Sequence, residues 1–202
     1  MSKTILYSIL VLILSIICLV SSKAADKTLI LYLPFDEGSG KKAEDKSQYG
    51  HHAELIKNYK WVDGKFEKAV EISGEQDTDI VKTKEADTLK IEGEITKMAW
   101  VKVTDWTGQG HMQIIGKNNH NGGEHSSYGL ALKGDGSAIQ AFFGTGNSRP
   151  TLQIAAKLEK GKWIHIAASY DGKAMKAYLN GAFVDEQAEE FKFKGTNDSS
   201  VR

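Results

Sequence analysis

Two dipeptides, Asp171-Gly172 and Asn180-Gly181, constrain the fold of this chain more than any other feature. Asp-Gly and Asn-Gly pairs accept positive φ at little cost, so between strand-like runs they predict tight β-hairpins. The runs on either side alternate apolar and other residues with a period of two, as half-buried strands do. We therefore expect a three-stranded antiparallel meander over Trp163–Tyr170, Met175–Leu179 and Ala182–Asp185.

The same alternation recurs earlier in the chain. It predicts strands over Leu29–Phe35 and Ile95–Val103, the second with Met98 and Trp100 on the face opposite its other apolar residues. Gly134-Asp135-Gly136 reads as a hairpin turn. Helical periodicity is nearly absent and no linker divides the chain. Many short strands with tight turns predict an all-β sandwich or barrel in one domain.

The first residues have the pattern of a secretory signal peptide. A lysine precedes an almost wholly apolar run, and Ser22-Lys23-Ala24 supplies the small residues of a cleavage site. An uncleaved anchor is the alternative, but the run is shorter than the roughly 20 residues that span a bilayer. A lipoprotein anchor at Cys18 would need a small residue before it, and Ile17 stands there. We expect residues 1–24 to be removed, residues 25–202 to form the domain, and the product to be secreted or held at the cell surface.

Charge and cysteine content exclude several classes of function. Lys and Arg number 26 and Asp and Glu number 26, so no net charge draws the chain to nucleic acid or to an anionic membrane. One cysteine can form neither an internal disulfide nor a cysteine-based zinc site. We therefore expect no nucleic-acid partner, and no membrane contact after signal cleavage.

Several motifs together resemble one known family. The matching residues are Leu33-Pro34-Phe35-Asp36-Glu37-Gly38-Ser39-Gly40 with Asp45-Lys46-Ser47 and Gly50, then Trp61 with Gly64–Val70, then Met98–Lys102, and most specifically Gly161–Gly172 with Tyr178–Gly181. This set resembles the laminin-G-like domains of the concanavalin A-like lectin/glucanase family. The resemblance implies a jelly-roll β-sandwich of two antiparallel sheets.

The end of the chain departs from the family pattern. Such domains usually close with a strand of an Ile-Asp-Glu-Val-Arg-like sequence, whereas here the residues end at Val201-Arg202. We expect that the last strand is missing and that the chain belongs to a larger multidomain protein. The alternative is a short variant whose open edge is covered by a partner.

The resemblance also implies a structural calcium ion near the end of the first strand. Asp36 is the matching carboxylate, and Asp45 in the following loop is a second candidate. Calcium prefers oxygen ligands of this kind. The alternative is that both residues are turn residues that accept hydrogen bonds from backbone amides.

A glycine-rich stretch from Trp106 to Tyr128, together with a later loop, holds the residue types that bind sugars. Aromatic rings and hydrogen-bonding side chains occur together there, and loops on a rigid sandwich often carry binding sites. The predicted ligand-binding residues are Trp106, His120, His125, Tyr128 and Arg149. A plain solvated loop is the alternative. His120 and His125 flank Glu124, but this spacing fixes no third ligand for a transition metal.

Catalysis receives less support from the sequence. Glycan hydrolysis on this fold needs two carboxylates at alternate positions of a cleft strand, whereas Asp185-Glu186 and Glu189-Glu190 lie in a polar run that reads as a solvated strand end. The sequence therefore predicts a secreted, non-catalytic recognition module for a polysaccharide or an extracellular glycoprotein. A glycan-cleaving enzyme and a purely structural adhesion module remain the alternatives.

Overall fold

The computed structural model describes residues 26–72, 81–117, 127–196 and 198–202. The predicted signal peptide lies outside these residues and remains a prediction. Within the described residues the secondary structure consists of β-strands and one short 3-10 helix. No helix in this part of the chain has the length and apolar character needed to cross a membrane.

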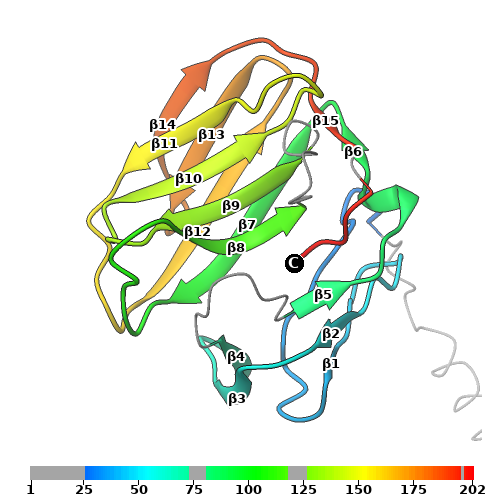
Figure 1. Cartoon of the computed structure of the whole chain (residues 1–202), viewed down its shortest axis with the longest axis vertical. Helices are drawn as coiled ribbons and strands as arrows, with labels where there is room; N and C mark the ends of the chain where they lie inside the picture. The colour runs from blue at the N-terminus through cyan, green and yellow to red at the C-terminus, as the bar shows by residue number, and fades with distance from the viewer. Residues whose placement is uncertain (1–25, 73–80, 118–126, 197) are drawn as a thin grey trace, which may run out of the picture.

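Figure 1 shows the strands in chain order. They are β1 (Lys42–Ala43), β2 (Ala53–Leu55), β3 (Tyr59–Asp63), β4 (Lys68–Ile72), β5 (Val81–Thr83), β6 (Ile91–Glu92), β7 (Ile95–Lys102), β8 (His111–Lys117), β9 (Tyr128–Lys133), β10 (Ala138–Phe143), β11 (Thr151–Ala155), β12 (Trp163–Tyr170), β13 (Ala174–Leu179), β14 (Ala182–Ala188) and β15 (Lys194–Gly195), with the 3-10 helix η1 (Asp87–Leu89) before β6.

Two four-stranded antiparallel sheets form the body of the molecule, in the orders β11-β10-β9-β8 and β14-β13-β12-β7. In Figure 1 the first sheet lies in front of the second. Their facing sides enclose the main core, to which Leu130, Ile139, Ile166 and Met175 contribute buried side chains. The predicted β-sandwich of two antiparallel sheets is therefore confirmed.

The predicted meander is confirmed as β12, β13 and β14. Strand β12 spans Trp163–Tyr170 as expected, and β14 runs three residues beyond the predicted end at Asp185. Asn180 and Gly181 have φ values of 51° and 82°, the left-handed conformation that this dipeptide adopts cheaply. Gly134-Asp135-Gly136 connects β9 and β10, as expected for a hairpin turn.

The predicted strand over Leu29–Phe35 is wrong, because no strand forms there. The N–H of Tyr32 donates to the Asp45 carboxylate at 2.8 Å instead of to a neighbouring strand. Pro34 has no N–H to donate, and Phe35 takes a positive φ of 61°. The apolar residues still serve burial, since Leu31 packs on the main core and Leu33 packs on a smaller one.

The smaller core belongs to a second group of strands. Ala43, Ala53 and Leu55 are buried in the sheet of β1, β2 and β5, and the β3–β4 hairpin lies beside them. Residues 201 and 202 run between β5 and β8. The Thr83 N–H donates to the Val201 carbonyl at 3.0 Å, and the Gly116 N–H donates to the Arg202 carbonyl at 2.9 Å. This segment links the small sheet to the front sheet of the sandwich.

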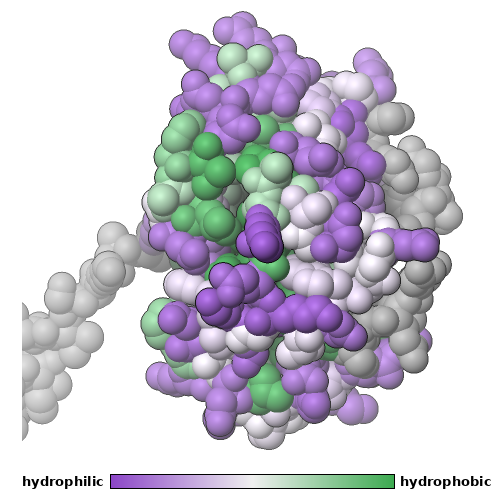
Figure 2. Space-filling model, turned by 90° about the vertical axis from the view of Figure 1, so that its left-hand side faces the viewer, coloured by the Kyte–Doolittle hydropathy of each residue, from purple (hydrophilic) through white to green (hydrophobic). Residues whose placement is uncertain are grey.

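Figure 2 shows the side of the molecule on which β11 and β14 form the sheet edges. Apolar side chains gather in the upper half of this side and are bordered by hydrophilic ones. On β14, Phe183 and Val184 are 56% and 42% exposed.

Candidate functional site

Three glutamines stand in one row across the front sheet. The strand register pairs Gln113 on β8 with Ala131 on β9, Ala131 with Gln140 on β10, and Gln140 with Gln153 on β11. Side chains at paired positions project from the same face of a sheet. The register therefore aligns three amide side chains across four strands, and we refer to Gln113, Gln140 and Gln153 as the amide row.

The amide row lies on the outward face of the sheet. Leu130, Leu132 and Ile139, which alternate with its residues, point into the main core. Ala131 and Gln140 in the centre are 3% and 9% exposed, whereas Gln113 and Gln153 on the flanking strands are exposed. The Gln140 Nε2 donates to Gln153 Oε1 at 2.7 Å. This pairing fixes the orientation of both amides and leaves further donors and acceptors for a ligand.

An aromatic ring and a guanidinium group adjoin the amide row. Phe142 lies two residues from Gln140 on the same face, and its ring covers Gly129, where an added Cβ would lie 2.1 Å from the ring. The guanidinium carbon of Arg149 stands 4.9 Å from the Phe142 ring centroid. This distance is within the range of a cation–π interaction. Amide, aromatic and guanidinium groups thus meet on one face.

Of the predicted ligand-binding residues that the structure describes, Arg149 alone lies beside the amide row. Trp106 lies at the other end of β10, where its ring packs against Gly136 in the β9–β10 turn and against the main core. Arg149 follows β10 in the β10–β11 loop. The structure therefore does not bring Trp106 and Arg149 together, because Trp106, in the β7–β8 connection, packs near the start of β10, whereas Arg149 follows its end. His120 and His125 lie outside the described residues.

The prediction that Tyr128 contacts a ligand is wrong. Its side chain is 4% exposed, packs edge-on to Phe193, and donates its hydroxyl to the Leu89 carbonyl at 3.1 Å. Burial raises the pKa of the Tyr128 hydroxyl. The residue begins strand β9 with its ring in the core, so no ring face is open to a sugar.

A Tyr128→Phe variant should show this structural role. We expect the free energy of unfolding to fall by about 1–2 kcal/mol, because the buried Leu89 carbonyl loses its donor. Tyr32→Phe is the control, since the Tyr32 side chain is 50% exposed. Urea unfolding of both variants measures the difference, and equal stability of the two would contradict the assignment.

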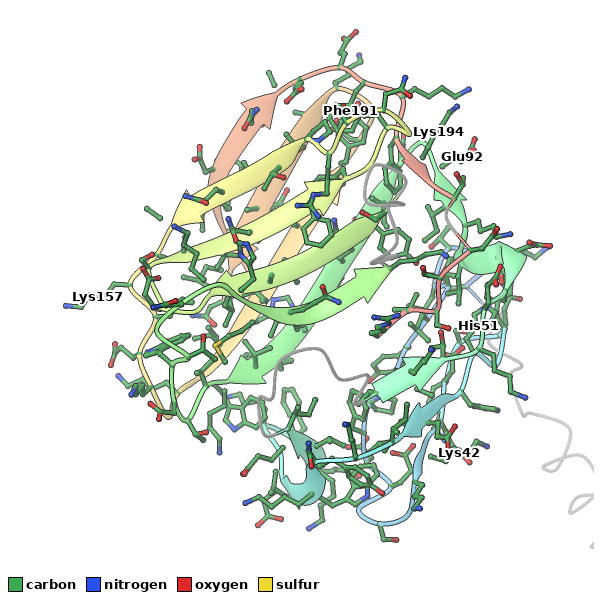
Figure 3. All side chains as sticks on the ribbon, in the orientation of Figure 1. Lys42, His51, Glu92, Lys157, Phe191 and Lys194 are labelled. Atoms are coloured by element: carbon green, nitrogen blue, oxygen red, sulfur yellow. The ribbon has the colours of Figure 1, made fainter. Side chains whose placement is uncertain are left out.

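A shallow pocket of about 560 Å³ lies at the other end of the front sheet. It is lined by Asp135, Gly136, Ser137, Ala155, Ala156, Lys157 and Leu158. Figure 3 shows Lys157 at this left-hand end, with its side chain directed away from the molecule, and Phe191 at the distant top end. The pocket continues the outward face of β11 beyond Gln153.

The predicted calcium ligands do not form a joint site. Asp45 is 5% exposed, and its two carboxylate oxygens accept hydrogen bonds from the N–H groups of Tyr32, Ser47 and His51 and from the Ser47 hydroxyl, at 2.6–2.9 Å. Burial raises its pKa, but the bonds from Ser47, Tyr32 and His51 outweigh burial, so the pKa is lowered overall. A carboxylate whose lone pairs are occupied in this way does not fit a calcium ligand.

Asp36 contacts a different segment from Asp45, since its carboxylate accepts a hydrogen bond from the Lys68 N–H at 3.4 Å. Among the described residues, no group of three or more His, Cys, Asp or Glu side chains is arranged to hold a metal ion. The alternative interpretation, that Asp45 is a turn residue that accepts from backbone amides, is the one that the structure supports.

The chain matches the family model of the concanavalin A-like lectin/glucanase superfamily, Laminin_G_3, over residues 74–202. The chain belongs to this superfamily. This member of the superfamily also shares a stretch of 30 residues that is 57% identical to mouse pappalysin-1, covering 15% of the chain and 2% of pappalysin-1.

Solved structures of low sequence identity have the same fold. The binding domain of Paraclostridial Mosquitocidal Protein 1 has a TM-score of 0.62 at 17% identity, with 81% of this chain and 41% of that one covered. Domain 4 of the arabinanase AbnA from Geobacillus stearothermophilus, solved with arabinotriose, has a TM-score of 0.55 at 19% identity, with 78% and 75% covered. The binding domain of botulinum neurotoxin serotype D has a TM-score of 0.55 at 16% identity, with 85% and 41% covered. The chain thus spans less than half of the two toxin domains.

Sequence reasoning missed the amide row. The alternation of exposed Thr151, Gln153 and Ala155 with buried apolar residues was a usable strand signal. The alignment of Gln113 with the other glutamines depends on the β-bulge between Gln113 and Ile115, which shifts the register of β8. That shift has no signature in the sequence.

Proposed function

We propose that this chain is a non-catalytic glycan-binding module of the concanavalin A-like superfamily, and that the amide row is its binding face. The observation that carries the proposal is the alignment of Gln113, Gln140 and Gln153 beside the Phe142–Arg149 cation–π pair. The module is secreted or displayed at the cell surface in this proposal, as part of a larger protein.

The chemistry of this face suits sugar hydroxyls. Each amide offers both a donor and an acceptor, so a row of amides can follow successive hydroxyls of a linear glycan. Neighbouring strands lie about 4.8 Å apart, which is close to the length of one sugar unit. The Arg149 guanidinium adds donors at one end of the row. On this basis the ligand class is a neutral linear polysaccharide.

The absence of paired carboxylates on this face favours binding over hydrolysis. The outward positions of strands β8–β11 carry no Asp or Glu. Retaining and inverting glycosidases both need two such groups flanking the scissile bond. Incubation with arabinan and β-glucan, followed by a reducing-end assay, tests this part of the proposal. New reducing ends would support the alternative of a glycan-cleaving enzyme.

A Gln140→Ala/Gln153→Ala variant tests the binding face. We expect it to lose affinity for the polysaccharide that the wild type binds by about tenfold or more, because two hydrogen-bonding groups worth roughly 1 kcal/mol each are removed. Affinity gel electrophoresis on arabinan, galactan and β-glucan provides the measurement. Gln187→Ala on β14 is the matched control, since it removes one amide from the other sheet. Unchanged migration of the double variant, or equal loss in the control, would refute this assignment.

Calcium binding remains a proposal drawn from the family resemblance. Because the Asp45 oxygens are already bonded, Asp36 is the carboxylate that would have to hold the ion. Export is likewise a proposal, and N-terminal sequencing of protein recovered from the medium tests it. A mature chain that begins at Ala25 would support removal of residues 1–24.

A further inference from the structure

The outward face of the second sheet carries an exposed aromatic cluster. Met98 and Trp100 project outward from β7 and are 56% and 39% exposed. The register of β7 and β12 pairs Trp100 with His165 and Lys102 with Trp163. All of these side chains therefore share one face, on the side of the sandwich opposite the amide row.

The tip of the β3–β4 hairpin adds two residues to this cluster. Phe66 is 68% exposed and meets Trp100 edge-on, with ring centroids 5.9 Å apart at 86°. Lys65 Nζ lies 5.2 Å from the Trp100 ring centroid, and the His165 ring lies 5.3 Å from it. Trp100 is thus held on two sides while much of its surface stays accessible.

The charged groups that contact the tryptophan rings of this face are both lysines. Lys65 contacts Trp100, and Lys102 Nζ stands 5.2 Å from the Trp163 ring. In the described part of the chain, neither ammonium group forms an ion pair with a carboxylate. The outward positions of β7 and β12 hold no Asp or Glu. A cation over a ring keeps donors available, so both lysines can still bind an anion.

We propose that this Trp100 face, made of Lys65, Phe66, Trp100, Lys102, Trp163 and His165, binds an acidic polysaccharide whose sugar units carry carboxylates. The C–H faces of sugar rings pack on exposed aromatic rings, and uronate carboxylates match ammonium groups. A neutral sugar would offer the two ammonium groups hydroxyl acceptors but no opposite charge. A second copy of the chain, docked through the same face, would bring like charges together at the interface.

Polygalacturonate and neutral galactan are the probes, with the whole chain tested in affinity gels and by calorimetry. We expect polygalacturonate to bind at this face and galactan not to bind there. Trp100→Ala should weaken polygalacturonate binding by about tenfold, given roughly 1–3 kcal/mol per stacked ring in a comparable case. Trp100→Phe should retain most of the affinity. Lys65→Met/Lys102→Met should weaken binding and reduce its dependence on salt, because screening acts on the charge contribution.

The Gln140→Ala/Gln153→Ala variant separates this inference from the proposed function. This variant should bind polygalacturonate with the affinity of the wild type, whether or not its affinity for neutral glycans changes. Several results would overturn the inference: unchanged affinity of Trp100→Ala at equal thermal stability, equal binding of galactan and polygalacturonate at this face, or salt-independent binding. A dimer in size-exclusion chromatography that Trp100→Ala dissolves would assign the face to a second copy instead.

Discussion

Asp45→Ala should lower the free energy of unfolding by about 3–5 kcal/mol, one of the largest effects expected of any single substitution in this chain. The Asp45 carboxylate accepts hydrogen bonds from three backbone amides and a hydroxyl, and these join the segment around Tyr32 to the turn at Ser47 and His51. Removing the carboxylate leaves those amides unpaired in a site that is 5% exposed at Asp45. Urea unfolding at pH 7 measures the loss.

Asp36→Ala is the matched control, since its single bond to the Lys68 amide is long at 3.4 Å. We expect this substitution to lower the free energy of unfolding by less than about 0.5 kcal/mol. The loss in Asp45→Ala should be the same with calcium and with EDTA. A loss that appears only when calcium is present would contradict our assignment and make Asp45 a metal ligand.

Because the pKa of Asp45 is lowered in the folded protein, its contribution to the free energy of unfolding depends on pH. An acid whose folded pKa lies below its unfolded value adds stability above the ordinary pKa of about 3.9, and the folded protein loses it as the pH falls through the lowered value. The stability gap between wild type and Asp45→Ala should therefore be full at pH 7 and narrow below pH 4. A gap that stays constant down to pH 2 would refute this reasoning.

Lys97→Met should reverse its effect on stability between neutral and alkaline pH. Lys97 projects from β7 into the main core, where it is 4% exposed and its Nζ donates to the carbonyls of Gly129 and Phe142 at 3.0 and 2.9 Å. Nζ also lies 3.5 Å from the Phe143 ring centroid. Burial holds the pKa of this amine well below its usual range.

The direction in which wild-type stability changes with pH follows from the number of protons that the folded and unfolded chains bind. Between the lowered folded pKa and the ordinary value of about 10.4, the unfolded chain binds a proton that the folded chain does not, so wild-type stability rises with pH there, by up to about 1.4 kcal/mol per pH unit. At neutral pH we expect Lys97→Met to be at least as stable as the wild type. Near pH 10 the wild type should be the more stable protein, because it keeps its two hydrogen bonds without the cost of a buried charge.

Urea unfolding at pH 7 and pH 10 measures this reversal. Lys173→Met in an exposed turn is the control, and its stability relative to the wild type should not change with pH. If the free energies of unfolding of Lys97→Met and the wild type differ by the same amount at both pH values, the Lys97 amine does not change its protonation on unfolding, and the assignment fails.

Strands with a solvent-exposed face were predictable from the sequence, whereas a strand without exposed residues was not. Strand β7 shows the alternation in its sequence, and strands β12, β13 and β14 follow one another through the Asp171-Gly172 and Asn180-Gly181 turns, so local chemistry determines them. In β10 every residue is buried, and its sequence Ala138–Phe143 has no period of two. Its outward residues Ala138, Gln140 and Phe142 have little exposed surface, and only Gln140 is polar, so the sequence lacks the alternation that marks a half-buried strand.

The candidate site was less predictable than the fold, because it depends on contacts between distant segments. Arg149 was selected from its loop, but the partner that orients it, Phe142, comes from an unpredicted strand. Asp45 looked equally suited to a metal or to a turn, and the choice was decided by Tyr32, which lies 13 residues away. The alternation placed Trp100 on the face opposite the strand's other apolar residues, whereas its contact with Phe66 depends on how the β3–β4 hairpin docks.

The exposure of β14 has a consequence for solubility. This strand is an edge of its sheet, all seven of its residues are exposed, and it begins with the apolar run Ala182-Phe183-Val184. Such an edge is a template for strand pairing between molecules and hence for aggregation. The acidic residues Asp185 and Glu186 follow the run directly, in the position of gatekeepers that repel a second copy. Carboxylates that the sequence predicts to lie in a solvated strand end would thus also oppose self-association at high concentration.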